Sequence, residues 1–455
     1  MSERLPWHAK LLYGVGDTGL SLTGSIIGAY FNIFMLNVAG LRADLAAWVV
    51  LVGRLWDPIN DPMIGYLSDR ARTRWGRRRP FLLFGSLPFA LAFSLLWWRP
   101  PLENEWLLLT YYCVAYVLYE AAATFIYMPY YTLTPELTAD YDERTSLTSY
   151  RMFFSIAGSL VAFTLPLVMV PAFTRANAPR ALIMGLTFGL VSAVGMLITF
   201  AGTKERPEYQ EQTQPNLLDS LRAAGANPPF VFSMAVYLLT WVAVSMVEAN
   251  LLLFVTYVVR RADDSNLIMA SVFVVAILVL PFWEWASRNM NKRLAYIIGI
   301  AFWAVVQIVL VMLGPATPLW AILVLAALAG IGVSAAHVIP WAIIPDAIEW
   351  DELQTGERHE GMFYSLVQLL KKLATAVALF LGLKLLGWTG YIPEGVNQPA
   401  STVMVIRILT GPIPAFFLCA GIVFALLYPL TRERHAEVRQ EIAQRKAAQT
   451  AEEAT

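Results

Sequence analysis

The chain has 455 residues, of which 58% are hydrophobic and only 15% are charged, and its formal net charge is zero. Soluble domains carry roughly 25% charged residues, so this composition excludes an ordinary soluble protein. The zero net charge gives no reason to expect a nucleic-acid partner. Apolar stretches of about 20 residues, the length that an α-helix needs to cross a bilayer, recur almost end to end. We therefore expect an all-α integral membrane protein that crosses the cell membrane many times.

Twelve stretches are long and apolar enough to span a membrane with some tilt. They cover about residues 11–38, 45–67, 80–98, 106–133, 149–171, 180–202, 229–259, 265–287, 293–313, 318–345, 361–387 and 402–430. A long polar segment separates the first six from the last six. The predicted parts are an amino-terminal six-helix bundle at 1–202, a middle loop at 203–228, a carboxy-terminal six-helix bundle at 229–430 and a tail at 431–455. The polar, charged tail predicts a solvated helix that ends in disorder.

Basic residues collect in the loops of one side. The connection over residues 69–79 contains six arginines, and more Lys and Arg residues follow residues 203, 287 and 430. Loops rich in Lys and Arg stay in the cytoplasm, so we expect this side, the middle loop and both termini to be cytoplasmic. Arg260 and Arg261 fall on the other side, so the bias is strong without being complete.

A weak internal repeat relates the two halves. Proline and acidic motifs of the first half recur 210 to 214 residues later, an offset close to half of the chain. The pairs are Pro129 with Pro340, Pro135-Glu136 with Pro345-Asp346, and Glu143-Arg144 with Glu357-Arg358. Parallel six-helix repeats are typical of the major facilitator fold, so the repeat favours that fold.

The second apolar stretch contains two carboxylates, Asp57 and Asp61. Residues at i and i+4 share one face of a helix, so the two like charges repel. Each also costs about 2.5–3.5 kcal/mol at the bilayer centre, and a cation, a proton or a basic side chain must compensate them. Asn60 adds an oxygen to this face, and hard cations prefer oxygen ligands. We predict a Na⁺ site here. The alternative is a salt bridge between Asp57 and Arg54.

The motif around this pair resembles the glycoside–pentoside–hexuronide:cation symporters, the family of the melibiose permease. The resemblance rests on Trp56-Asp57-Pro58-Ile59-Asn60-Asp61-Pro62-Met63-Ile64-Gly65, on Ser68-Asp69-Arg70 and on residues 74–80, and it extends over nearly the whole chain. The second half is similar to the sodium-dependent lysophospholipid symporters at residues 247–254, 281–285 and 340–341. The resemblance implies a transporter of the major facilitator fold that works by alternating access. We expect it to be a monomer. The resemblance also implies Thr124 as a further ligand of the cation.

Two neighbouring lysines, Lys371 and Lys372, lie inside the eleventh stretch. A lysine in a membrane span needs an anion, a proton loss or a route to the interface. Helical spacing places Lys371 on one line with Tyr364 and Thr375, which favours Lys371 as the lysine that faces the cavity. Alignment of Tyr364-Ser365 with the family motif instead implies Lys372, which we prefer.

The resemblance implies a substrate site that departs from the sugar-binding pattern of the family. Ser21 and Tyr127 stand where the family has acids that bind sugar hydroxyls, and Tyr131 replaces a tryptophan. Buried sugar hydroxyls need matching partners, whereas basic groups without these acids suit a phosphate. We therefore favour a lysophospholipid-like amphiphile over a glycoside. The predicted substrate-binding residues are Lys372, Trp341, Tyr127, Tyr131, Arg151, Asp17, Ser21 and Glu248.

A set of charged residues near the cytoplasmic side is predicted to form the gate between the halves. As exposed ion pairs they would contribute only about 0–1 kcal/mol each, which suits a gate that must open. The predicted gating residues are Asp69, Arg70, Arg77, Glu136, Arg144, Asp346 and Arg358.

The sequence therefore predicts a cation-coupled symporter whose partners are the bilayer, a coupling ion and a small-molecule or lysolipid substrate. The alternative is a proton-coupled sugar symporter or exporter on the same fold. We find no His-Glu-x-x-His and no Gly-x-Ser-x-Gly motif, so we expect neither an enzyme nor catalytic residues. The only expected cofactor is the coupling ion, Na⁺ or H⁺.

Overall fold

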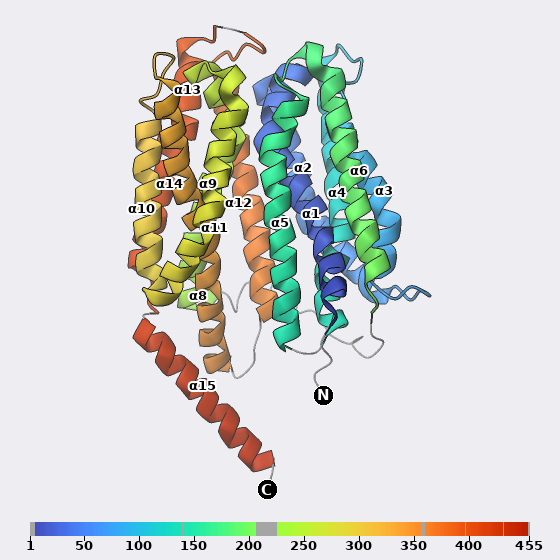
Figure 1. Cartoon of the computed structure of the whole chain (residues 1–455), viewed down its shortest axis with the longest axis vertical. Coiled ribbons are helices and arrows are strands. Elements are labelled where there is room, and N and C mark those ends of the chain that lie inside the picture. Colours follow the sequence, from blue (N-terminus) through green and yellow to red (C-terminus); the bar gives the residue numbers. More distant parts are fainter. Residues whose placement is uncertain are drawn as a thin grey trace.

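The computed structural model describes residues 5–138, 141–205, 225–355, 360–395, 397–430 and 432–453. These residues form helices and connecting loops, with one isolated bridge between Thr73 and Gly76. Figure 1 shows the long helices standing side by side, with both chain ends and the helix α15 at one end of the molecule. We call this the terminal end, and the other the distal end.

The first half contains six long helices. The elements are α1 (Trp7–Ile33), the π-helix η1 (Phe34–Ala39), α2 (Ala43–Arg70), α3 (Arg79–Leu96), α4 (Glu105–Leu137), α5 (Tyr141–Met169), the short η2 (Arg175–Asn177) and α6 (Ala178–Gly202). The helix α1 packs on α5 and α6, and α4 packs on α2 and α3.

The second half repeats this plan. Its elements are α8 (Pro228–Leu253), the π-helix η3 (Phe254–Val259), η4 (Ala262–Asp264), α9 (Ser265–Asn289), α10 (Lys292–Leu310), α11 (Leu319–Thr355), α12 (Glu360–Trp388), α13 (Ala400–Thr410), α14 (Pro412–Leu426) and α15 (Arg432–Glu453). Both α1 and α8 continue into a π-helical turn that ends at a residue with left-handed backbone, Gly40 in the first half and Arg260 in the second. This shared ending is a structural counterpart of the repeat in the sequence.

Eleven helical segments of the described residues are long and apolar enough to cross a membrane. The helix α2 is not among them, although it packs between α4 and α12 and has 28 residues. It carries Arg54, Asp57 and Asp61 in its middle, which lowers its hydropathy. With α2 the structure accounts for the twelve predicted stretches.

Two regions differ from the prediction. The last predicted stretch is interrupted at Gly411, which separates α13 from α14. Pro412 explains the break, because proline lacks a backbone donor and disfavours helical backbone at the residue before it. The tail is helical as predicted, but α15 packs on α11 and Arg445 donates to the Leu353 carbonyl at 2.6 Å. The tail helix is therefore docked on the protein.

The halves meet along the helix pairs α2–α12, α1–α8 and α5–α9. At the distal end, Asn37 of η1 joins two tyrosines of the second half. Its amide donates to the Tyr257 hydroxyl at 2.7 Å, and the Tyr391 hydroxyl donates to its carbonyl oxygen at 2.6 Å. These hydrogen bonds, the first of them buried, connect the halves at this end.

We expect Asn37→Leu to open the distal end. The substitution removes both bonds but leaves the 3.1 Å hydrogen bond between the two hydroxyls, so we expect a loss of about 0.5–1.5 kcal/mol for the closed arrangement. Spin labels on the exposed residues Glu103 and Ile392, one in each half, report the distance across this end. The long-distance population should grow in Asn37→Leu. An unchanged distance distribution would mean that the three residues do not hold this end closed.

The close approach of α2 and α4 depends on Gly53. A Cβ atom at this position would lie 1.6 Å from the Tyr116 ring, which is itself fully packed. We therefore expect Gly53→Ala to destabilise the protein by about 1–3 kcal/mol through overpacking. Gly65→Ala on the same helix is the matched control, because its Cβ would meet only the Met128 methyl at 3.9 Å. Thermal unfolding of both variants checks this, and equal unfolding temperatures would contradict it.

Candidate functional site

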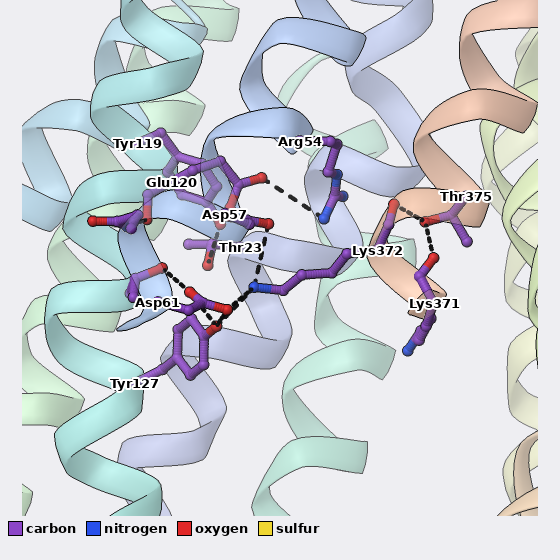
Figure 2. Close-up of polar contacts among 12 residues, drawn as sticks. Thr23, Arg54, Asp57, Asp61, Tyr119, Glu120, Tyr127, Lys371, Lys372 and Thr375 are labelled. Atoms are coloured by element: carbon purple, nitrogen blue, oxygen red, sulfur yellow. Dashed lines mark hydrogen bonds and ion pairs between the residues drawn. The ribbon is translucent and has the colours of Figure 1, made fainter. Parts of the chain in front are cut away.

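A cluster of charged side chains lies between α2, α4 and α12 in the middle of the molecule. Lys372 of α12 extends toward α2, where its ammonium lies 3.2 Å from the Asp57 carboxylate and 2.9 Å from that of Asp61 (Figure 2). The two acids share one face of α2, as their spacing predicts. Lys372 therefore joins the second half of the chain to the carboxylate pair of the first.

Two residues of α4 complete the surroundings of Asp61. Thr124 donates a hydrogen bond to Asp61 at 3.0 Å, and the Tyr127 hydroxyl lies 3.1 and 3.2 Å from its two oxygens. Lys372 in turn donates to the Tyr127 hydroxyl at 2.8 Å. Thr124 and Tyr127 are three residues apart and so lie on the same side of α4. The structure thus brings together Asp61, Thr124, Tyr127 and Lys372.

Asp57 is the most buried member of the cluster, with none of its surface exposed. Neither carboxylate oxygen accepts a hydrogen bond of good geometry from the described residues, although Lys372 lies at ion-pair distance. Buried carboxylates normally have their oxygens satisfied. Asp57 therefore offers two oxygens that a further positive group would satisfy.

Arg54 does not pair with Asp57, which was the alternative explanation of the acid pair. It forms its ion pair with Glu120 of α4, at 3.7 Å. Asn60 also points toward α4, and its amide donates to the Glu120 backbone carbonyl at 3.4 Å. Sequence analysis did not assign a role to Glu120. Its place one helical turn before Thr124 is the signal that could have found it.

Lys371 points away from the acid pair (Figure 2). Its ammonium lies 3.5 Å from the centre of the Trp241 ring on α8, a cation–π contact. Glu248, one of the predicted substrate residues, lies further along α8 against α1. A Cβ atom at Gly28 of α1 would be 2.6 Å from its carboxylate. Lys371 and Glu248 therefore lie outside the Asp57–Asp61 cluster.

A second polar group lies on α1, α4 and α5. The Tyr131 hydroxyl donates to Asp17 at 3.1 Å, and the Arg151 guanidinium sits 4.8 Å above the Tyr131 ring. The rings of Tyr131 and Tyr127 are 5.6 Å apart, so this group adjoins the carboxylate cluster. Ser21 donates back to the Asp17 backbone carbonyl at 2.8 Å, and its hydroxyl hydrogen is therefore already used within α1.

Trp341 of α11 lies in an aromatic group of the second half. Its ring is 4.9 Å from Tyr237 in an edge contact and 6.2 Å from Tyr364 in a stacked one. It is half-buried. The structure thus places Trp341 among aromatic side chains, apart from the ion pairs of α2.

Asp346, one of the predicted gating residues, contacts two residues of the second half. It pairs with Lys292 at 2.7 Å and lies 3.6 Å from His435, both in its own half. Arg70 is exposed at the end of α2, and the Arg77 backbone N–H donates to Glu205. The side chains of Asp69, Glu136 and Arg144, and the whole of Arg358, lie outside the part of the chain that the structure describes.

These observations define the class of protein to which this chain belongs. Membrane-spanning helices in two similar halves, with ion pairs buried where the halves meet, describe a multi-pass membrane transporter of the major facilitator fold. A family model described as "MFS/sugar transport protein" matches residues 12–432, and the chain belongs to this family. It is a transporter and not an enzyme.

Relatives agree with this family. The chain is 33% identical to an uncharacterized symporter of Synechocystis, with 97% of each chain covered. It is 28% identical to the sodium-dependent lysophosphatidylcholine symporter 1 of Gallus gallus, over 96% of this chain and 89% of the relative. The crystal structure of a D-xylose–proton symporter superposes with a TM-score of 0.68 at 14% identity, over 93% of this chain and 97% of that one. This last likeness shows the fold alone.

Proposed function

We propose that this protein is a Na⁺-coupled symporter that carries a lysophospholipid-like amphiphile by alternating access. The observation that carries the proposal is the position of Lys372. Its ammonium occupies the space between Asp57 and Asp61, where a cation from solution would also bind. Lys372 and Na⁺ then compete for the same carboxylates.

The formal charges of the cluster favour one added monovalent cation, provided that Lys372 moves off Asp61 but stays within the cluster. Three carboxylates, Asp57, Asp61 and Glu120, face two basic groups, Arg54 and Lys372. With every group in its charged form the cluster carries one net negative charge. Uncompensated charge is costly inside a membrane protein, so one bound monovalent cation is the simplest compensation.

The residues present fit a sodium ion. Asp57 supplies two buried oxygens without hydrogen-bond partners, and Asp61 and Thr124 supply further oxygens beside it. This set has only two carboxylates, and the described residues contain no group of three or more His, Cys, Asp or Glu side chains arranged for a metal ion. Carboxylate, hydroxyl and amide oxygens are the ligands that hard cations prefer.

Competition between Na⁺ and Lys372 would couple the ion to the substrate. When Na⁺ binds the carboxylates, Lys372 is released from Asp61 and, through Tyr127, changes the wall that adjoins Tyr131 and Arg151. A substrate that binds this rearranged wall tightens Na⁺ binding by the same factor, as thermodynamic linkage requires.

The chemistry of the site favours an anionic headgroup over a sugar. Tyr127, where the resemblance implied a sugar-binding acid, is engaged with Asp61 and Lys372, and Ser21 donates within its own helix. Arg151 is a basic group close to these positions and suits a phosphate. Several relatives are named as sodium-dependent lysophosphatidylcholine symporters, which supports the same substrate class.

Uptake into proteoliposomes tests the proposal. Purified protein should take up labelled lysophosphatidylcholine when an inward Na⁺ gradient is imposed, and melibiose only weakly. A K⁺ gradient of equal size is the control for ionic strength and membrane potential. Uptake of the glycoside but not of the lysolipid would reject the substrate class and leave the cation site untouched.

Proton coupling is the second candidate, because a proton would also compensate Asp57 at its unsatisfied oxygens. In that case an inward proton gradient drives uptake without Na⁺.

The arginine-rich loops support a cytoplasmic position of the terminal end. Protease accessibility of the tail in right-side-out vesicles tests this orientation.

A further inference from the structure

A cavity of about 260 Å³ lies at the terminal end of the second half, apart from the ion pairs of α2. Its walls come from the start of α10, the end of α14 and the first turns of α15. Figure 1 shows α15 beginning next to the terminal ends of α10 and α14. A water molecule takes up about 30 Å³ in the liquid, so the cavity has room for a polyatomic group.

The corresponding place in the first half is filled by a carboxylate of the chain itself. Glu205, which follows α6, accepts hydrogen bonds from the backbone N–H groups of Arg77, Arg78 and Arg79 at the start of α3, at 2.7 Å for the last two. The start of a helix attracts anions, because its first N–H groups lack partners within the helix and carry positive partial charge. In the first half, the start of α3 therefore binds an anion, the Glu205 carboxylate.

The helix α10 corresponds to α3 in the repeat, and its start shares one feature with that of α3 but differs in its cap: the Asn291 side chain accepts from the Arg293 backbone N–H at 3.0 Å. Arg79 of α3 donates to the Phe200 carbonyl of α6, and Arg293 of α10 donates in the same way to the Leu426 carbonyl of α14. The second half thus keeps the arginine, while the connection at residues 427–431 contains no Asp or Glu and the side chain of Glu433 lies outside the part of the chain that the structure describes. The cavity lies beside this connection.

The walls of the cavity are basic. Lys292, Arg293 and Arg439 line it together with one carboxylate, Asp346, which is paired with Lys292 at 2.7 Å. With His435 neutral, these groups have an excess of two positive charges. The neighbouring Glu349 accepts from His435 at 2.7 Å and lies 4.0 Å from Arg439, so it compensates only part of this excess.

Tyr428 provides independent evidence for a missing acceptor. It lines the cavity and only 7% of it is exposed, yet its hydroxyl has no hydrogen-bond partner among the described residues. A buried donor without an acceptor is unfavourable. An anion in the cavity would accept from this hydroxyl and from Arg293 at the same time.

We infer that this cavity binds a phosphate group, which lies beside the Asn291-capped start of α10 and accepts from the Tyr428 hydroxyl and the basic lining residues. A phosphate offers several acceptor oxygens to separate donors, and Arg and helix starts are its usual partners. The phosphate comes either from an anionic lipid headgroup or from solution. The site is separate from the Asp57–Asp61 cluster, so the inference does not depend on the proposed function.

Thermal unfolding of the full-length protein tests the inference in two arms. In a glycosidic detergent, sodium phosphate is compared with sodium chloride at equal Na⁺ concentration and ionic strength. In nanodiscs, phosphatidylcholine alone is compared with phosphatidylcholine containing phosphatidic acid. A stabilisation in the first arm identifies free phosphate, and one in the second arm alone identifies a lipid headgroup.

Tyr428→Phe is the decisive variant, because the hydroxyl that it removes has no partner in the described protein. We expect its stability without phosphate to equal that of the wild type, and its apparent affinity for the phosphate ligand to fall about tenfold. Arg293→Gln should weaken binding as well. Arg407→Gln is the matched control, since Arg407 also donates to a main-chain carbonyl, that of Val311, but lies away from the cavity. If neither arm stabilises the wild type, or if Tyr428→Phe responds as strongly as the wild type, the cavity is not a phosphate site.

Discussion

Replacement of Asp57 by asparagine is expected to abolish the stimulation of uptake at the Na⁺ concentration that half-saturates the wild type. Asp57 is completely buried and its oxygens accept no hydrogen bond of good geometry from the described residues, so asparagine removes the charge and the ion pair with Lys372 but no such hydrogen bond. Loss of one charged ligand corresponds to about 1.5–3 kcal/mol, which is roughly a 10- to 150-fold weaker apparent affinity for Na⁺. Uptake as a function of Na⁺ concentration in proteoliposomes measures this.

Asp44→Asn is the matched control for this experiment. Asp44 lies on the same helix, but at its start, where it pairs with the exposed Arg42. Its replacement should leave the Na⁺ dependence unchanged. Asp61→Asn should behave like Asp57→Asn, because both acids contact Lys372. Na⁺ stimulation that survives both substitutions would place the cation site elsewhere in the chain.

Replacement of Lys372 by methionine is expected to make the stability of the protein depend on Na⁺. Without the ammonium, Asp57 and Asp61 repel each other in a buried site, and removal of one partner from a buried ion pair costs about 3–5 kcal/mol. The side chains of Lys372 and Asp61 are 18% and 26% exposed, so solvent reduces this loss and we expect its lower part. Sodium should restore the unfolding temperature, because it binds only the folded form.

Lys371→Met is the matched control for Lys372→Met, because it removes the neighbouring lysine of the same helix. Lys371 contacts the Trp241 ring and not the acid pair, so its replacement should not increase the effect of Na⁺ on unfolding. Uptake by Lys372→Met should be lost even in Na⁺, since nothing compensates the carboxylates when the ion leaves. Equal Na⁺ responses of the two variants would contradict the competition between Lys372 and Na⁺.

The carboxylate pair was accessible from the sequence, because charge inside an apolar stretch and helical spacing are local properties. The choice between Lys371 and Lys372 was not, since consecutive residues lie about 100° apart on a helix and the rotation of α12 is set by its packing on α2 and α8. The cavity-facing line through Thr375 favoured Lys371, but in the structure Lys372 contacts the acids. The family motif had implied Lys372, and its role stays a prediction.

Contacts between residues far apart in the chain could not be predicted from the sequence either. Glu120 and Arg54 are each ambiguous in the sequence, and only the packing of α4 on α2 brings them within 3.7 Å. The docking of α15 on α11 likewise depends on tertiary contacts such as that of His435 with Glu349. The break at Gly411, in contrast, had a local signal in Pro412.

The polarity of α2 has a consequence for biosynthesis. Among the helices that pack in the two halves, α2 falls below the hydropathy of a membrane span, and the ammonium that reaches its acids belongs to a residue 311 positions after Asp61. Chains are synthesised at about 5–20 residues per second, so α2 waits roughly 15–60 seconds for α12. During this interval the ribosome-bound chain has to shelter Asp57 and Asp61 by other means, such as ions, water or the insertion machinery. The ion pair between Lys372 and Asp61 can therefore form only after most of the second half has been synthesised.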